Sequence, residues 1–239
     1  MGCYFRLRRE LTHILCYLGE KMEQILYRIL DFIISVPTVL IALTFHECAH
    51  GFIAYKLGDP TAKYLGRLSL NPLRHIDIVG ALCMMLCGFG WAKPVPVDMR
   101  QFKNPKVGMA LCAIAGPLTN LILGFLGAFL YWGMILIFPS IAYNWYVMSL
   151  LSTFGILNIY LAIFNLIPLP PFDGSRIATA FLSDKYYIKL MQYERKIALG
   201  FFLVLICDDY FLGGHITSAL ATVVYWIFNG FLSLFNLLL

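Results

Sequence analysis

The sequence predicts an all-α protein that crosses a membrane several times, because its composition is strongly apolar and its apolar residues form long runs. Hydrophobic residues occupy 60% of the 239 positions and charged residues only 13%, whereas soluble domains average about 45–50% and about 25%. Several runs reach the roughly 20 residues that a helix needs to cross about 30 Å of hydrocarbon. A soluble fold would instead alternate polar and apolar faces. We therefore expect lipid to be the main solvent of this chain.

The apolar runs predict about five membrane-spanning helices, with four to six as the range. The long runs cover 29–55, 107–138, 145–167 and 216–239, and a shorter one covers 197–207. Between the first two lies a connection, 56–106, that is rich in glycine, proline and basic residues. Its apolar piece, 78–89, is too short to cross a membrane as a helix. We expect a re-entrant segment or a short membrane-associated β-hairpin there, after the first span.

Two histidines and a glutamate lie inside the first apolar run, in the sequence HECAH at 46–50. Residues i and i+4 of a helix share one face, so His46 and His50 can reach the same zinc ion. Glu47 lies beside that face, where its carboxylate can take a proton from water and return it to a leaving amine. Each of these groups would cost free energy in an apolar helix without a polar partner. The pattern therefore indicates a catalytic zinc site.

The two histidines leave that site one ligand short, because catalytic zinc usually has three protein ligands. The sequence PLPPFDG at 168–174 must end the helix before it and carries Asp173 near its tip. Irregular backbone at membrane depth is tolerated only where it lines protein or water. Taken alone, Asp173 would be an ordinary turn residue. Together with the histidine motif, it is the predicted third ligand of one zinc ion per chain, although several divalent metals accept such a ligand set.

Three segments together resemble the site-2 proteases, a family of intramembrane zinc metalloproteases. HECAH (46–50), GPLTN (116–120) and NLIPLPPFDG (165–174) occur in the family's order. The resemblance implies that the two histidines and the aspartate hold zinc while the glutamate activates water. It also implies that Asn120 and Asn165 lie near the cleft and bind the substrate backbone or the developing oxyanion. Without the family, both would be amides that hydrogen-bond between packed helices.

The apolar runs and the motifs together suggest how the chain is organised. We expect an amphipathic N-terminal arm at 1–28, a catalytic membrane core at 29–180 and C-terminal membrane segments at 181–239. The stretch 91–97 resembles the family's membrane-associated hairpin, which could present an edge to an extended substrate. Ser175 stands where many members have a second glycine after the Asp-Gly pair. No PDZ or CBS module fits, so the chain looks like the compact form of the family.

The resemblance implies hydrolysis of peptide bonds in or near transmembrane segments of membrane-anchored proteins, in regulated intramembrane proteolysis or in clearance of signal-peptide remnants. The alternative is a divalent-metal transporter that uses the histidine and aspartate cluster as a transit site, but the other spans offer almost no further ligands for a path. A different type of membrane zincin would need a downstream glutamate, and only Glu194 follows Glu47. The net charge of +5 lies in the connections and not in a basic patch with aromatics, so no nucleic-acid partner is expected.

Basic residues gather in two connections, 56–106 and 173–196. By the positive-inside rule both face the cytoplasm, which puts the predicted active site on the cytoplasmic side of a multi-pass protein, in the plasma membrane of a prokaryote. The same rule conflicts with the basic residues that precede Asp31, unless 4–28 lies along the surface or 78–89 crosses the membrane.

Overall fold

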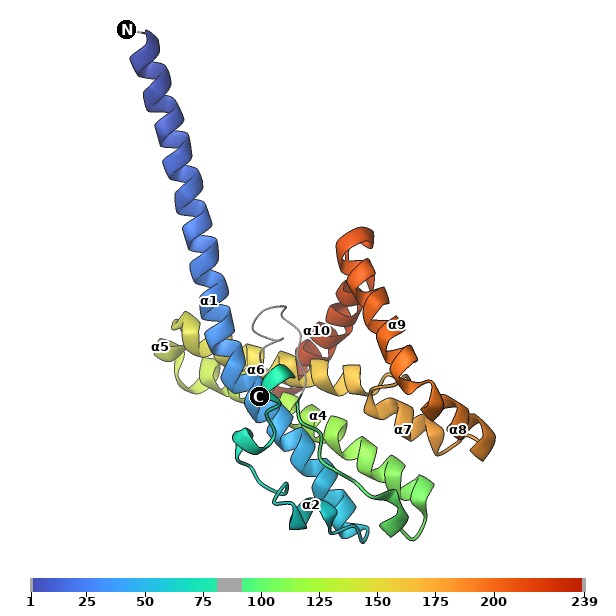
Figure 1. Cartoon of the computed structure of the whole chain (residues 1–239). Coiled ribbons are helices and arrows are strands. Elements are labelled where there is room, and N and C mark those ends of the chain that lie inside the picture. The colour runs from blue at the N-terminus through green and yellow to red at the C-terminus, as the bar shows by residue number, and fades with distance from the viewer. Residues whose placement is uncertain (1, 81–91, 238–239) are drawn as a thin grey trace. The chain divides into compact units, whose positions relative to one another are not determined.

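The computed structural model describes residues 2–80 and 92–237, with side chains described from residue 19 onward apart from 20, 24, 25, 28, 31, 184 and 187 (Figure 1). The named elements are α1 (Gly2–Lys56), α2 (Thr61–Tyr64), η1 (Pro72–Arg74), η2 (Met99–Gln101), α4 (Pro105–Ile137), α5 (Pro139–Ala142), α6 (Trp145–Asn165), α7 (Asp173–Thr179), α8 (Asp184–Gln192), α9 (Glu194–Cys207), η3 (Asp208–Leu212) and α10 (His215–Asn236). The predicted all-α class is confirmed for these residues.

The predicted β-hairpin is not supported. Where the structure describes the stretch, at 92–97, it forms no strand, and one isolated antiparallel bridge joins Ile76 to Ala92. The re-entrant piece at 78–89 falls largely on 81–91, outside the described residues. A sheet needs a paired partner strand, and local sequence carries little information about such pairing.

Four of the described helices are long and apolar enough to cross a membrane. They are Phe32–Lys56, Pro105–Ile137, Trp145–Asn165 and His215–Asn236. Their bounds lie within a few residues of the four long apolar runs, and their number falls within the predicted range. The short run at 197–207 forms most of α9, which has 14 residues and is too short for a span.

The chain divides into two units, Met1–Pro37 and Thr38–Leu239. The first unit contains the N-terminal part of α1, whose helix passes through Pro37 without ending. The amphipathic arm predicted at 1–28 lies in this part, and its position on a membrane surface stays a prediction. All of the predicted site residues belong to the second unit.

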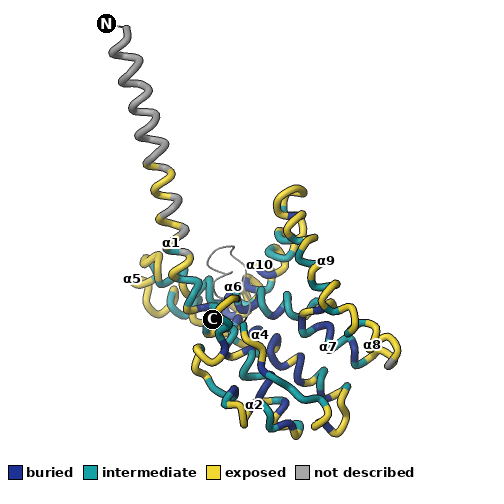
Figure 2. Tube along the Cα trace, in the orientation of Figure 1, coloured by how far each residue is buried: buried dark blue, intermediate teal, exposed yellow. Residues whose placement is uncertain are grey.

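In the second unit, α4, α6 and α10 pack closely on one another. A Cβ at Gly124 would lie 2.6 Å from Ile159 Cγ1, and a Cβ at Gly127 would lie 2.6 Å from the Gly155 Cα. These glycines let the backbones of α4 and α6 approach, as expected for helices in lipid. Figure 2 shows buried stretches in α4, α7 and α10. The buried apolar cluster consists of Ala128, Ile159, Val224, Phe228 and Phe235.

Asparagine side chains set the starts of the two central helices. The Asn104 side chain accepts a hydrogen bond from Val107 N at the start of α4, where Pro105 is the first helical residue. The Asn144 side chain does the same for α6. At the other end of α6, the helix stops at Asn165, and the prolines that follow prevent its continuation. The break after α6 therefore sits at a defined level of the bundle.

The chain turns sharply between α6 and α7. A Cβ at Gly174 would clash with the carbonyl oxygens of Leu166 and Ile167, so the backbone folds back closely on the end of α6. Only glycine fits such an approach. The turn leaves Asp173 as the first residue of α7, which packs against α4.

Candidate metal centre

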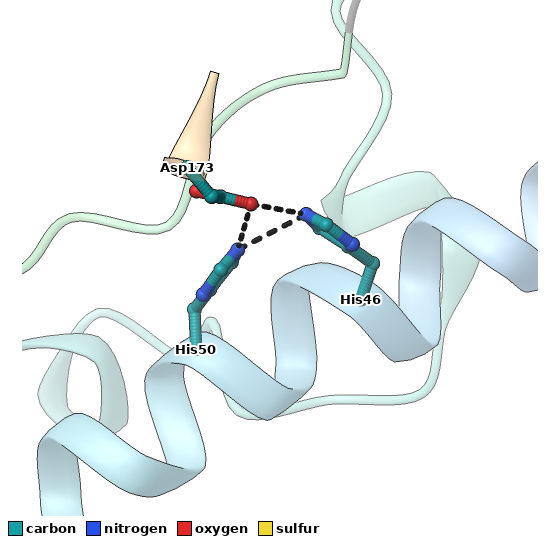
Figure 3. A group of neighbouring side chains, drawn as sticks. All are labelled: His46, His50 and Asp173. Carbon is teal, nitrogen blue, oxygen red and sulfur yellow. Dashed lines mark hydrogen bonds and ion pairs between the residues drawn. The ribbon is translucent and has the colours of Figure 1, made fainter. Parts of the chain in front are cut away.

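Three predicted ligands meet at one point (Figure 3). His46 Nε2 lies 3.1 Å and His50 Nε2 lies 3.2 Å from the same Asp173 Oδ2 atom, and the two Nε2 atoms are 3.0 Å apart. The histidines project from one face of α1, four residues apart, and the aspartate comes from the turn after α6. Both histidines are buried, at 5% and 9% exposure. The structure thus brings together residues that lie more than a hundred positions apart in the sequence.

The outer nitrogens of both imidazoles contact oxygen acceptors. His46 Nδ1 lies 2.6 Å from Asn120 Oδ1, and His50 Nδ1 lies 2.8 Å from the Cys112 carbonyl oxygen. A neutral imidazole has one N–H, which must point at these acceptors. The lone pairs of both Nε2 atoms are therefore directed at the centre of the cluster, as metal-binding histidines require.

The cluster fits a zinc ion. Its three ligand atoms lie within 4.8 Å of one another. Asp173 Oδ2 is buried and finds no hydrogen-bond donor among the described residues. Three converging lone pairs, two on imidazoles and one on a carboxylate, are satisfied by a divalent cation such as zinc.

Gly116, in the segment GPLTN, makes room for the two rings. A Cβ there would lie 2.5 Å from His50 Nε2 and 2.6 Å from His46 Cε1. Any side chain would therefore push the imidazoles apart. This close contact gives a physical reason for glycine at the start of that segment of α4.

Glu47 lies outside the ligand cluster and contacts the stretch at 92–98. Its Oε2 accepts a hydrogen bond of 2.8 Å from Val95 N. The stretch is anchored on both sides of Val95: Arg67 donates to the carbonyl oxygens of Lys93 and Pro94, and Asp98 N donates to Asp59 Oδ2. The predicted substrate-presenting stretch therefore lies directly beside the predicted general base.

The two asparagines predicted to bind substrate lie in different surroundings. Asn120 is fully buried and contacts both His46 and Asn158. Asn165 is half-buried at the end of α6, where its Nδ2 donates to the Leu161 carbonyl of the same helix. Asn120 belongs to the surroundings of the metal cluster, whereas the contact made by Asn165 is local. Their contacts with substrate stay predictions.

Three contributions to the site were missed at the level of the sequence. They are the Cys112 carbonyl, the Val95 N–H and the side chain of Asn158. Backbone groups carry no signal in a sequence. Asn158 does carry one, since an amide in the middle of the apolar helix α6 needs a buried partner.

Comparisons with known proteins identify the family of this chain. The family model described as Peptidase family M50 matches residues 131–207, which include Asp173. The chain is 41% identical to YwhC of Bacillus subtilis, over 76% of this chain and 82% of that protein. The chain belongs to peptidase family M50, the site-2 proteases. It is therefore a zinc metalloprotease, and its four apolar helices make it an integral membrane protein.

Two archaeal relatives extend the comparison. MJ0611 of Methanocaldococcus jannaschii is 32% identical over 63% of this chain and 72% of that protein. MJ0392 of the same organism, named "Zinc metalloprotease", is 31% identical over 70% of this chain and 40% of its own length. YwhC and MJ0611 are each named "Putative zinc metalloprotease". No solved structure matches the chain significantly.

Proposed function

We propose that this metalloprotease hydrolyses peptide bonds in or beside the transmembrane segments of membrane-anchored proteins. In this proposal His46, His50 and Asp173 are the zinc ligands and Glu47 is the general base. The observation that carries it is the convergence of the three ligand atoms. Two of them come from a helix, Phe32–Lys56, that is itself long and apolar enough to span a membrane. A protease centre in such a helix meets substrates that also lie in the membrane.

Zinc, when bound, supplies a Lewis acid that polarises a peptide carbonyl and lowers the pKa of a water molecule. The chain's own residues do the rest. The two Nδ1 hydrogen bonds hold the imidazoles in place, and Asp173 adds a negative charge at the centre. Glu47 accepts a proton from the attacking water and returns it to the leaving amine. The Val95 N–H donates to Oε2, which leaves Oε1 free of that bond to exchange the proton.

The substrate backbone has to leave its helical hydrogen bonds before it can be attacked, because the carbonyls of a helix already accept bonds within the segment. We place the unwound substrate beside the stretch at 92–98, whose Val95 N–H donates to Glu47. Asn165, half-buried before the turn to α7, is proposed to contact the substrate backbone. The site opens to the cytoplasmic side of the plasma membrane in this proposal, as the basic connections suggest.

The transporter alternative has little support. A transit path needs ligands staged along the protein, and within the described residues only His46, His50 and Asp173 form a group of three metal-ligating side chains. The names of the relatives point to proteolysis as well.

Mapping of cleavage sites tests the proposed substrate class. Membranes from cells that carry the wild type are compared with membranes from cells that carry Glu47→Gln, and new peptide termini are identified by mass spectrometry. We expect the termini specific to the wild type to lie inside, or within a few residues of, apolar segments of about 20 residues. Termini confined to soluble domains would rule out the proposed substrate class while leaving the metalloprotease assignment intact.

A further inference from the structure

Behind His46, three hydrogen bonds form a buried chain between α1, α4 and α6. His46 Nδ1 lies 2.6 Å from Asn120 Oδ1, and Asn120 Nδ2 donates to Asn158 Oδ1 at 3.1 Å. Asn158 Nδ2 in turn donates to the Phe154 carbonyl at 2.9 Å. Both asparagines have 0% exposure. The Asn120 and Asn158 side chains therefore cannot exchange these partners for bulk water.

The chain has a fixed direction because it ends on a backbone carbonyl. A carbonyl oxygen only accepts, so the Asn158 amide must turn its Nδ2 toward Phe154 and its Oδ1 toward α4. That oxygen requires a donor, which turns Nδ2 of Asn120 toward Asn158 and leaves Oδ1 of Asn120 facing His46. The imidazole must then carry its proton on Nδ1.

The opposite orientation of the Asn120 amide would prevent His46 from binding a metal through Nε2. With Nδ2 facing the ring, His46 would have to carry its proton on Nε2, the nitrogen that faces His50 and Asp173. A protonated Nε2 has no lone pair for a metal. An amide alone is symmetric enough in shape to adopt either orientation, so its direction has to be imposed by a neighbour.

The other histidine, His50, needs no such chain of amides. His50 Nδ1 points directly at a backbone carbonyl, that of Cys112, which has no second orientation. His46 instead relies on a side-chain amide. Of the two histidines, only His46 therefore needs a further residue to set its tautomer.

We propose that Asn158 is a positioning residue of the metal centre: it fixes the orientation of the Asn120 amide and thereby keeps His46 Nε2 available to zinc. This inference rests on the proposed function, in which His46 is a zinc ligand. Residues that orient metal-binding histidines typically affect metal affinity by roughly 10- to 100-fold.

The test measures zinc affinity in the purified full chain by competition with a chelator, and ligand geometry by visible absorption of the cobalt(II) form. Asn158→Leu has a similar volume but neither accepts nor donates, so Asn120 can turn over. We expect a zinc affinity about 10-fold lower and a changed cobalt spectrum. Full burial favours the neutral acid in Asn158→Asp. Its carbonyl oxygen still accepts from Asn120 and its O–H can donate to the Phe154 carbonyl, so we expect its zinc affinity to stay within about threefold of the wild type.

A double variant separates this role from simple packing. Asn120→Asp presents an acceptor to His46 in either orientation, so Asn158 has nothing left to impose. Asn158→Leu should therefore lower zinc affinity in the wild-type background but not in the Asn120→Asp background. A packing defect would lower it in both, and that result would overturn the inference. Wild-type affinity in Asn158→Leu would overturn it as well.

Two controls keep the outcomes distinct. Ser152→Ala removes another side-chain hydrogen bond of α6, from Ser152 Oγ to the Ser149 carbonyl, and should leave zinc affinity unchanged. His46→Ala tests the ligand set itself. If His46→Ala keeps its zinc, the proposed metal site is wrong. If His46→Ala loses zinc while Asn158→Leu binds it as tightly as the wild type, only the positioning role of Asn158 is wrong. Should Asn158→Leu not fold, Asn158→Asp decides, since a large loss of affinity there contradicts the inference.

Discussion

Replacing Gly116 by alanine puts a methyl group where the two ligand imidazoles lie. The new Cβ would be 2.5 Å from His50 Nε2 and 2.6 Å from His46 Cε1. Relief to an ordinary contact distance requires each ring to move by about 0.9 Å. Metal–ligand distances tolerate only about 0.2 Å, so both histidines cannot remain on one ion. We expect zinc affinity to fall by at least about 100-fold, which is more than the usual effect of losing a residue that hydrogen-bonds to a metal ligand.

The assay is zinc content per chain by mass spectrometry after dialysis against a buffered zinc concentration, with chelator competition to give the affinity. Gly133→Ala is the matched control, because it lies on the same helix and its Cβ would meet nothing within 4 Å. That variant should keep its zinc and gain a few tenths of a kcal/mol to about 1 kcal/mol of helix stability. Full zinc occupancy in Gly116→Ala at the wild-type affinity would refute the placement of both histidines around this glycine.

Three further predictions address the ligand and the base, the stretch at 92–98, and the helix packing. Asp173→Ala should lose most of its zinc, whereas Glu47→Gln should keep it and lose activity, as metal analysis and a cleavage assay would show. Arg67→Met removes the hydrogen bonds that anchor the stretch at 92–98 through two of its carbonyls. Activity should therefore fall about 10- to 100-fold with zinc content unchanged. Gly155→Ala pushes a Cβ to 2.5 Å from a phenylalanine ring of α10 and should lower stability by about 1–3 kcal/mol, while Gly200→Ala, in open space, should not.

Each of these predictions has a contrary result. Zinc retained in Asp173→Ala would place the third ligand elsewhere. If Arg67→Met lost zinc in proportion to its loss of activity, the stretch at 92–98 would be needed for metal binding rather than for the catalytic step. A thermal unfolding midpoint for Gly155→Ala equal to that of Gly200→Ala would show that α6 and α10 can separate at no cost.

Much of the fold follows from local sequence. The spans were predictable because hydropathy and length are properties of one segment at a time, and the histidine pair because i and i+4 always share a helical face. Asp173 was predictable because prolines force a break and expose an acid next to it. All three signals are read without knowledge of any distant residue.

The remainder depends on how distant segments meet. Whether 92–97 pairs as a strand is set by a partner, and the structure shows only a bridge between Ile76 and Ala92. The link from Asn158 to Asn120 depends on the relative register of α4 and α6, which glycine contacts determine. The Val95 N–H that meets Glu47 belongs to the backbone and has no identity in the sequence. The predicted ligands could therefore be read from the sequence, whereas the groups that contact them could not.

The length of α4 limits how deep the reaction can take place. Its 33 residues extend about 50 Å at 1.5 Å per residue, well beyond the roughly 30 Å of hydrocarbon, so the helix must tilt or project. Lys106 marks its polar end, and Gly116, under the imidazoles, lies only about 15 Å further along the axis. The metal therefore sits no deeper than about half the hydrocarbon thickness below that end. In the proposed function, a membrane-spanning substrate has to bring its scissile bond to this depth, in the half of its span nearest the same face.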